Sequence, residues 1–255
     1  MHPGAAPSNH LRFLRQIALP EVGPDGQDRL AATTVAIAGE AEDDLASEIA
    51  ARYLAAGGVG TLRLIGPAPV AAGLTAALRA SNPDVTVETR PWPDADAGAS
   101  RWLDALKGVD LIVRSGFDDD PMLRAAVRLG IPAVLLRALE DRAEVLALRR
   151  HGPCPHVDLA IPHKRAAGLR GGAAAVVAGT LGAAEAMLIV IGRVPISMAT
   201  SAPSGAPPAS PARARHLTIP LSPSTEGGAT PRAQDIPWAP ECFRCGGGGT
   251  EMVFS

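Results

Sequence analysis

The sequence has few aromatic residues, few cysteines and little net charge. Aromatic residues are 3% of the 255 residues, and the net charge of −2 comes from 24 basic and 26 acidic residues spread along the chain. Without a basic patch, the chain lacks the electrostatic footprint of a nucleic-acid-binding protein. Three cysteines, an odd number in a chain of this length, do not form a disulfide framework, so thiols or metal ligands are expected.

Long hydrophobic runs are also scarce. One segment, residues 171–192, meets a crude criterion for a membrane span. Glu185 lies near its centre and its first half is Ala and Gly, so a buried core helix is expected, with a span as the alternative. The first 16 residues contain no continuous apolar segment typical of a secretory signal. These features predict a cytoplasmic protein with no membrane partner and no nucleic-acid partner.

Two catalytic fingerprints are missing. The chain has no G-x-G-x-x-G sequence, which argues against a nicotinamide or flavin enzyme. It also has no G-x-S-x-G elbow, so a hydrolase has no support in the sequence.

What the chain does contain is a regular alternation of apolar runs and amphipathic helical segments. This pattern predicts an α/β fold, a doubly wound, Rossmann-like, mainly parallel sheet with helices on both faces. An apolar run from Ala143 predicts a C-terminal antiparallel extension. The expected organisation is an N-terminal helical arm at 1–30, a Rossmann-type domain at 31–199, a Pro/Ala/Ser-rich linker at 200–215, and a C-terminal strand with a Cys-x-x-Cys tail at 216–255.

The first turn between strand and helix is acidic. The strand of residues 33–39 ends at Gly39, where a dinucleotide-type fold would place further glycines to hold phosphates. Four carboxylates follow instead, on Glu40, Glu42, Asp43 and Asp44. They would repel a triphosphate unless metal neutralises them. The alternative is that they only cap the helix that follows and match its dipole.

Several passages follow the pattern of a known family. Residues 12–39, RFLRQIALPEVGPDGQDRLAATTVAIAG, contain an Arg-aromatic-x-Arg-Gln-Ile pattern, a Gly-x-x-Gly-Gln pair and the first strand. Later passages are RYLAAGGVGTLRLI at 52–65, SNPDVTVE at 81–88, VDLIVRSGFDD at 109–119 and GTLGAAEAM at 179–187. Together they resemble the ThiF/MoeB/HesA family of ubiquitin-activating-like enzymes over about residues 12–195.

The resemblance implies a family of enzymes that use magnesium and ATP to adenylate the C-terminal glycine of a ubiquitin-like or sulfur-carrier protein. Gly39 matches a family position for ATP, and Asp118 or Asp119 loosely matches the one for magnesium. Other positions differ, because Ile65-Gly66-Pro67 replaces the acidic residue and loop expected after the second strand. A lysine that contacts ATP has no counterpart between Pro67 and Ala80. These departures argue against binding of ATP and magnesium.

In the family, the second arginine of the opening pattern reaches across a dimer interface to the partner's ATP phosphates. Arg15 holds that position, so the resemblance implies a catalytic role in trans, with an ordinary surface cation as the alternative. The implied partners are a second copy of the chain or an active family member, together with a ubiquitin-like carrier protein.

The cysteines lie where many family members have a structural zinc site. Cys242-Phe-Arg-Cys245 forms one knuckle of such a site, and Cys154 with His156 takes the place of the other. The alternatives are a zinc site of three cysteines and one histidine, and a flexible tail with two free thiols.

Two functions remain open. The first is a catalytically degenerate subunit that dimerises and binds a carrier protein or an active partner. The second is a working ATP-dependent adenylyltransferase whose acidic turn holds magnesium.

Overall fold

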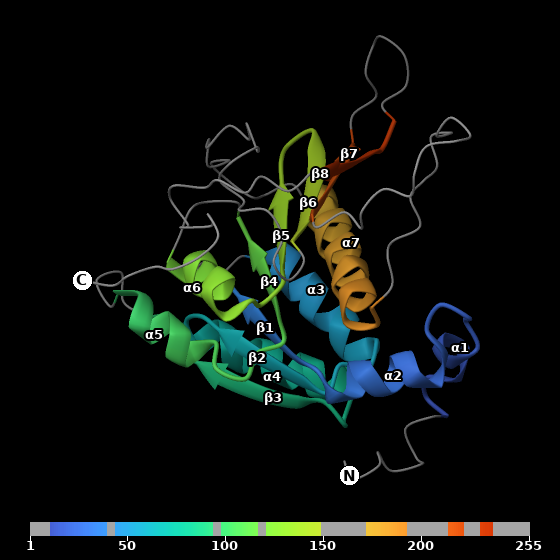
Figure 1. The fold of residues 1–255 in the computed structure, drawn as a ribbon, viewed down its shortest axis with the longest axis horizontal. Helices are drawn as coiled ribbons and strands as arrows, with labels where there is room; N and C mark the ends of the chain where they lie inside the picture. The colour runs from blue at the N-terminus through green and yellow to red at the C-terminus, as the bar shows by residue number, and fades with distance from the viewer. Residues whose placement is uncertain are drawn as a thin grey trace, which may run out of the picture.

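The computed structural model describes residues 11–39, 44–93, 98–116, 121–148, 172–192, 214–221 and 230–236. In these residues the chain forms one eight-stranded sheet with helices on both faces (Figure 1). The strands are β1 (Thr34–Ala38), β2 (Thr61–Ile65), β3 (Thr86–Arg90), β4 (Leu111–Ser115), β5 (Ala133–Ala138), β6 (Arg142–Leu148), β7 (Ala214–Pro220) and β8 (Arg232–Ile236). The helices are α1 (Leu14–Ile17), α2 (Gly23–Ala32), α3 (Leu45–Ala56), α4 (Ala68–Ser81), α5 (Gly98–Ala105), α6 (Pro121–Leu129) and α7 (Gly172–Val190).

The strand order is β3-β2-β1-β4-β5-β6-β7-β8. The first five strands in this order pair in parallel, and β6, β7 and β8 pair antiparallel. The chain leaves β1 toward β2 on one side and later returns to place β4 on the other side. This reversal makes the carboxyl end of β1 the switch point at which open α/β sheets bind ligands.

Each central strand contributes to two hydrophobic cores because its side chains alternate between the faces of the sheet. In β1, Val35 and Ile37 belong to the core under α3, α4 and α7, whereas Ala36 and Ala38 belong to the core under α5 and α6. Burial on both faces explains why the strands are continuous apolar runs in the sequence.

The predicted fold class is therefore confirmed. The apolar run from Ala143 lies in β6, which pairs antiparallel with β5 as expected. The strand β8 was not expected, because its residues lie in a segment rich in Pro and Gly.

Helix α7 contains most of the apolar segment at residues 171–192, the one that meets the criterion for a membrane span. By length and composition it could cross a membrane, with a mean hydropathy of 1.9. In the fold it packs against α3, β5 and β6, and its Glu185 is buried and paired with Arg215 of β7, with Nη1 and Oε1 3.1 Å apart. These contacts are those of a core helix, as the buried charge in its centre predicts.

Glycine lets α7 approach α3 closely. A Cβ atom placed on Gly179 would lie 2.5 Å from the carbonyl oxygen of Ala46 and 2.8 Å from Cβ of Ile49. A Cβ atom on Gly182 would similarly collide with the side chain of Leu136 in β5. The small residues of α7 therefore set the distance between this helix, α3 and the sheet.

Replacing Gly179 by Ala should lower the free energy of unfolding by about 1–3 kcal/mol, because α3 and α7 must separate to admit the methyl group. Gly73 of α4 is a matched control, since a Cβ atom there meets nothing within 4 Å. Gly73→Ala should raise the free energy of unfolding by about 0.5–1 kcal/mol through helix propensity. Urea unfolding of both variants measures these changes, and equal effects at the two glycines would contradict the close packing.

Candidate functional site

Asp44 connects the start of α3 to the neighbouring strand β4. This residue is the N-cap of α3, and its Oδ1 atom accepts a hydrogen bond from the backbone N–H of Ser47 at 3.1 Å. The same oxygen accepts a second hydrogen bond from the hydroxyl of Ser115 at the end of β4, at 2.5 Å. The hydroxyls of Ser47 and Ser115 lie 3.1 Å apart. One carboxylate thus joins the start of α3 to the carboxyl end of β4.

Asp44 also lies directly against Gly39. A Cβ atom placed on Gly39 would be 2.9 Å from Oδ2 of Asp44, so the missing side chain leaves the space that the carboxylate fills. In folds of this class, the N-terminus of the helix after the first strand is where phosphates receive backbone N–H groups. A carboxylate of the chain therefore occupies the position where such a fold would bind an anionic ligand.

A second glycine shapes the same edge of the sheet. A Cβ atom on Gly66 would lie 2.8 Å from the carbonyl oxygen of Gly39, so the ends of β1 and β2 can meet only without a side chain there. Beside these glycines is a cavity of about 310 Å³ between α3 and α4. Glu48 and Arg52 of α3 line it and form an i,i+4 ion pair of 2.6 Å, with both side chains about two-fifths exposed.

Arg15 lies at the other end of α3 from this turn. It is exposed on α1, and the neighbouring Phe13 is buried with its ring against Gly58, just beyond the C-terminus of α3. A helix of 12 residues is about 18 Å long, so α3 separates Arg15 from Gly39 by roughly that distance. Within this chain, Arg15 does not belong to the site at Gly39.

Several predicted site residues lie outside the described residues. Among them are Asp118 and the expected zinc ligands Cys154, His156, Cys242 and Cys245. The match of Asp118 to the family's magnesium position and the zinc site are both untested, and the zinc site stays a prediction. In the part of the chain that the structure describes, no group of three His, Cys, Asp or Glu side chains could hold a metal ion.

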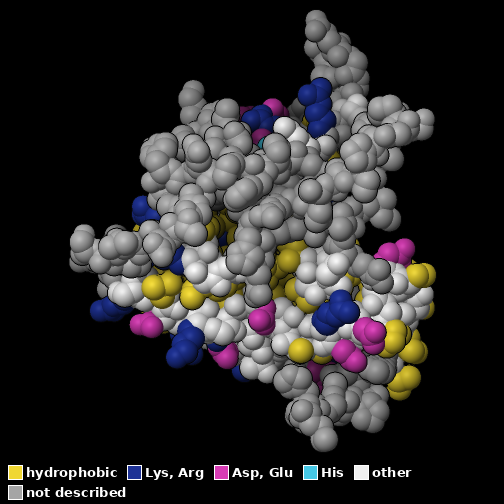
Figure 2. All heavy atoms as spheres, viewed as in Figure 1, with side chains coloured by type: hydrophobic (Ala, Val, Ile, Leu, Met, Phe, Trp, Pro, Cys, Tyr) yellow, Lys and Arg dark blue, Asp and Glu magenta, His cyan; other side chains and the backbone are white. Residues whose placement is uncertain are grey.

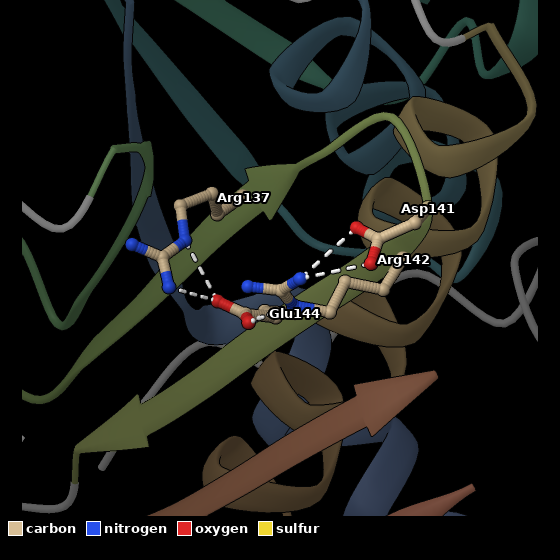
Figure 3. Close-up of polar contacts among 4 residues, drawn as sticks. All are labelled: Arg137, Asp141, Arg142 and Glu144. Atoms are coloured by element: carbon tan, nitrogen blue, oxygen red, sulfur yellow. Dashed lines mark hydrogen bonds and ion pairs between the residues drawn. The ribbon is translucent and has the colours of Figure 1, made fainter. Parts of the chain in front are cut away.

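A buried polar cluster on β5 and β6 was not predicted from the sequence. Glu144 is 4% exposed and accepts hydrogen bonds from Arg137 and Arg142 (Figure 3). The Arg137 Nε–Oε2 and Arg142 Nε–Oε1 distances are both 2.7 Å. Arg142 also donates to both oxygens of Asp141 at 3.0 Å. The hydrogen bond that Arg142 donates to Glu144 is the main reason that the pKa of Arg142 is raised. The available signal was a set of opposite charges on the apolar run of β5 and on the run expected to extend the sheet antiparallel.

His216 of β7 lies near this cluster. Burial lowers its pKa because the charged imidazolium loses solvation. Glu144 opposes this effect, whereas Arg137 and Arg142 reinforce it. The folded state therefore keeps His216 neutral at pH values at which a solvated histidine is protonated.

Comparison with solved structures finds this fold in PaaA and MccB, among other proteins. PaaA matches with a TM-score of 0.63 and 15% identity, over 92% of this chain and 76% of PaaA. MccB of E. coli with MccA-N7isoASN matches with a TM-score of 0.64 and 17% identity, over 95% of this chain and 76% of MccB. The chain shares the fold of PaaA and MccB. At this identity the likeness establishes the fold alone.

A structure of MccB with ATP also matches, with a TM-score of 0.60 and 17% identity over 94% of this chain and 80% of MccB. No family model and no curated protein matches the sequence.

The lowered pKa of His216 predicts a pH dependence of stability. As the pH falls below about 6.5, the unfolded chain takes up a proton at His216 that the folded chain does not. The contribution of neutral His216 to the free energy of unfolding is therefore full above that pH and is lost progressively below it. Urea unfolding at pH 7.5 and 5.5 measures the loss, which should be smaller in His216→Gln. An identical loss in both proteins would contradict the burial of a neutral histidine.

Proposed function

We propose that this chain is a catalytically degenerate relative of the ThiF/MoeB/HesA activating enzymes. In this proposal it has lost ATP-dependent adenylation and acts as a dimerising subunit. It binds a ubiquitin-like or sulfur-carrier protein, or an active family member, in the cytoplasm. The observation that carries the proposal is the position of Asp44 against Gly39 at the N-terminus of α3.

The carboxylate of Asp44 competes with a phosphate in two ways. It accepts the Ser47 N–H, one of the donors at the helix N-terminus that an anionic ligand would use. It also repels an anion, since two unit charges about 4 Å apart repel by roughly 1 kcal/mol in water and about 4 kcal/mol near a protein surface. A nucleotide would have to displace the cap of α3 and tolerate its charge.

The neighbouring structures support the choice of activating-enzyme relatives. MccB is described as a Microcin C7 biosynthetic enzyme and was solved with ATP and, separately, with N-formylated MccA. MccB thus shows that a protein with this fold can bind both ATP and MccA. We infer that this chain keeps the polypeptide-binding role and has lost the nucleotide.

The N-terminal arm supports dimerisation. Leu11, Leu14 and Leu19 expose 75%, 52% and 50% of their surface, although they are large apolar side chains. Figure 2 shows hydrophobic side chains at the right-hand edge of the molecule, where Figure 1 places α1. Clustered apolar exposure of this kind marks interaction surfaces. Because Arg15 lies in the same arm, an interface formed there would carry its guanidinium toward a partner's site.

One observation favours the alternative function, an active ATP-dependent adenylyltransferase with a diverged phosphate site. The cavity of about 310 Å³ beside Gly39 and Gly66 is open at the switch point of the sheet. An acidic turn bridged by magnesium to a triphosphate would use that space. The two functions differ in whether the isolated chain binds ATP.

Titration calorimetry with magnesium and ATP separates the two functions. The wild-type chain should show no binding at 1 mM ATP. Such a titration resolves dissociation constants up to the order of 1 mM. Asp44→Asn keeps an N-cap side chain of the same shape and removes the charge, so any ATP affinity should rise by about tenfold or more. Asp44→Ser, a second good N-cap, controls for size. Micromolar ATP binding by the wild type would contradict the proposal of a degenerate subunit.

The dimer proposal predicts a change in mass. The wild type should be dimeric by light scattering, and Leu14→Glu should shift it to the monomer because the charge would be buried in the interface. Val127→Glu is the matched control, since Val127 of α6 is 43% exposed outside the arm. Arg15→Ala should leave the dimer intact and lower the adenylation rate of an active partner. If Leu14→Glu were as dimeric as the control, the proposal that the arm forms the interface would be wrong.

A further inference from the structure

Two small residues of α4 line the cavity between α3 and α4. Ala71 and Gly73 line the cavity, and a Cβ atom on Gly73 would meet nothing within 4 Å. Larger side chains at these positions would occupy part of this space. The space is a groove at the carboxyl ends of β1 and β2.

The floor of the groove is apolar. Ile37 and Leu64 come from β1 and β2 and are each 4% exposed, and Leu74 of α4 packs against the same core. A ligand in the groove would place an apolar body on these side chains and gain the free energy of removing that surface from water.

The polar lining of the groove carries an excess of negative charge. Among the described residues that line it, Arg52 is the one cation, and it is paired with Glu48. This leaves the carboxylate of Asp44, whose Oδ2 atom is withdrawn from solvent and receives no hydrogen bond in the described structure. A buried carboxylate oxygen without a donor is costly, so a donor or a positive charge that reaches it is bound favourably.

We propose that this groove binds a small organic cation, a primary amine on an apolar body. The ammonium group donates to Asp44, and the body lies on Ile37, Leu64 and Leu74. The charge of the groove selects the cation, and the space beside Gly73 admits it. The site does not depend on the proposed function, because it requires the charge of Asp44 and not the loss of ATP binding.

Three probes of one shape and different charge test the site. Benzylamine, benzyl alcohol and benzoate differ in the group attached to the same ring, and amide chemical shifts of the full chain report where each binds. Benzylamine should bind at millimolar concentration or below and shift the amides of Gly66 and Gly73. Benzyl alcohol should bind about tenfold more weakly, as expected for losing a charge-assisted hydrogen bond, and benzoate should not bind. Equal binding of the three probes would overturn the proposal.

Two variants locate the interaction. Gly73→Leu fills the groove and should abolish benzylamine binding, whereas Ala72→Leu, at the exposed neighbouring position of α4, should leave it unchanged. Asp44→Asn keeps the N-cap and should bring benzylamine and benzyl alcohol to similar affinity. Unchanged benzylamine binding in Gly73→Leu, or an unchanged preference in Asp44→Asn, would contradict the site. Binding of ATP by the wild type would count against the proposed function and leave this site standing.

Discussion

The carboxylate of Asp44 is the constraint on which the switch point of this fold depends. It caps α3 through Ser47, holds the end of β4 through Ser115, and rests on the bare backbone of Gly39. A helix N-terminus offers few unpaired donors, and a group already bound there must leave before another can enter. The same side chain that stabilises α3 therefore decides which ligands the edge of the sheet can accept.

Much of the fold could be predicted from the sequence, because strands buried on both faces are apolar throughout and strands paired in parallel need helical connections. Gly39 could be placed at the switch point by the same reasoning. The contact between Asp44 and Ser115 could not be predicted, since it joins residues 71 positions apart and depends on the register of β4 against β1. The groove beside Gly73 depends on how far α4 lies from α3, which no local pattern encodes. The strand β8 lacks an apolar alternation, so nothing in its residues marked it.

The cluster around Glu144 places charged side chains where β5 pairs with β6. Arg137 and Arg142 give Glu144 hydrogen bonds that offset its desolvation, and Asp141 in turn binds Arg142. Such a network adds little net stability compared with apolar side chains, but breaking it leaves a buried ion without partners. It therefore fixes the pairing of β5 with β6 more than it strengthens the fold.

The ion pair between Glu185 and Arg215 joins segments 30 positions apart, one in the central helix α7 and one in β7 near the end of the sequence. Until β7 pairs with β6, Glu185 lacks this cation. Burying its carboxylate then costs free energy, which disfavours the packing of α7 against the sheet. Completion of the core around α7 therefore requires β7 to be in place.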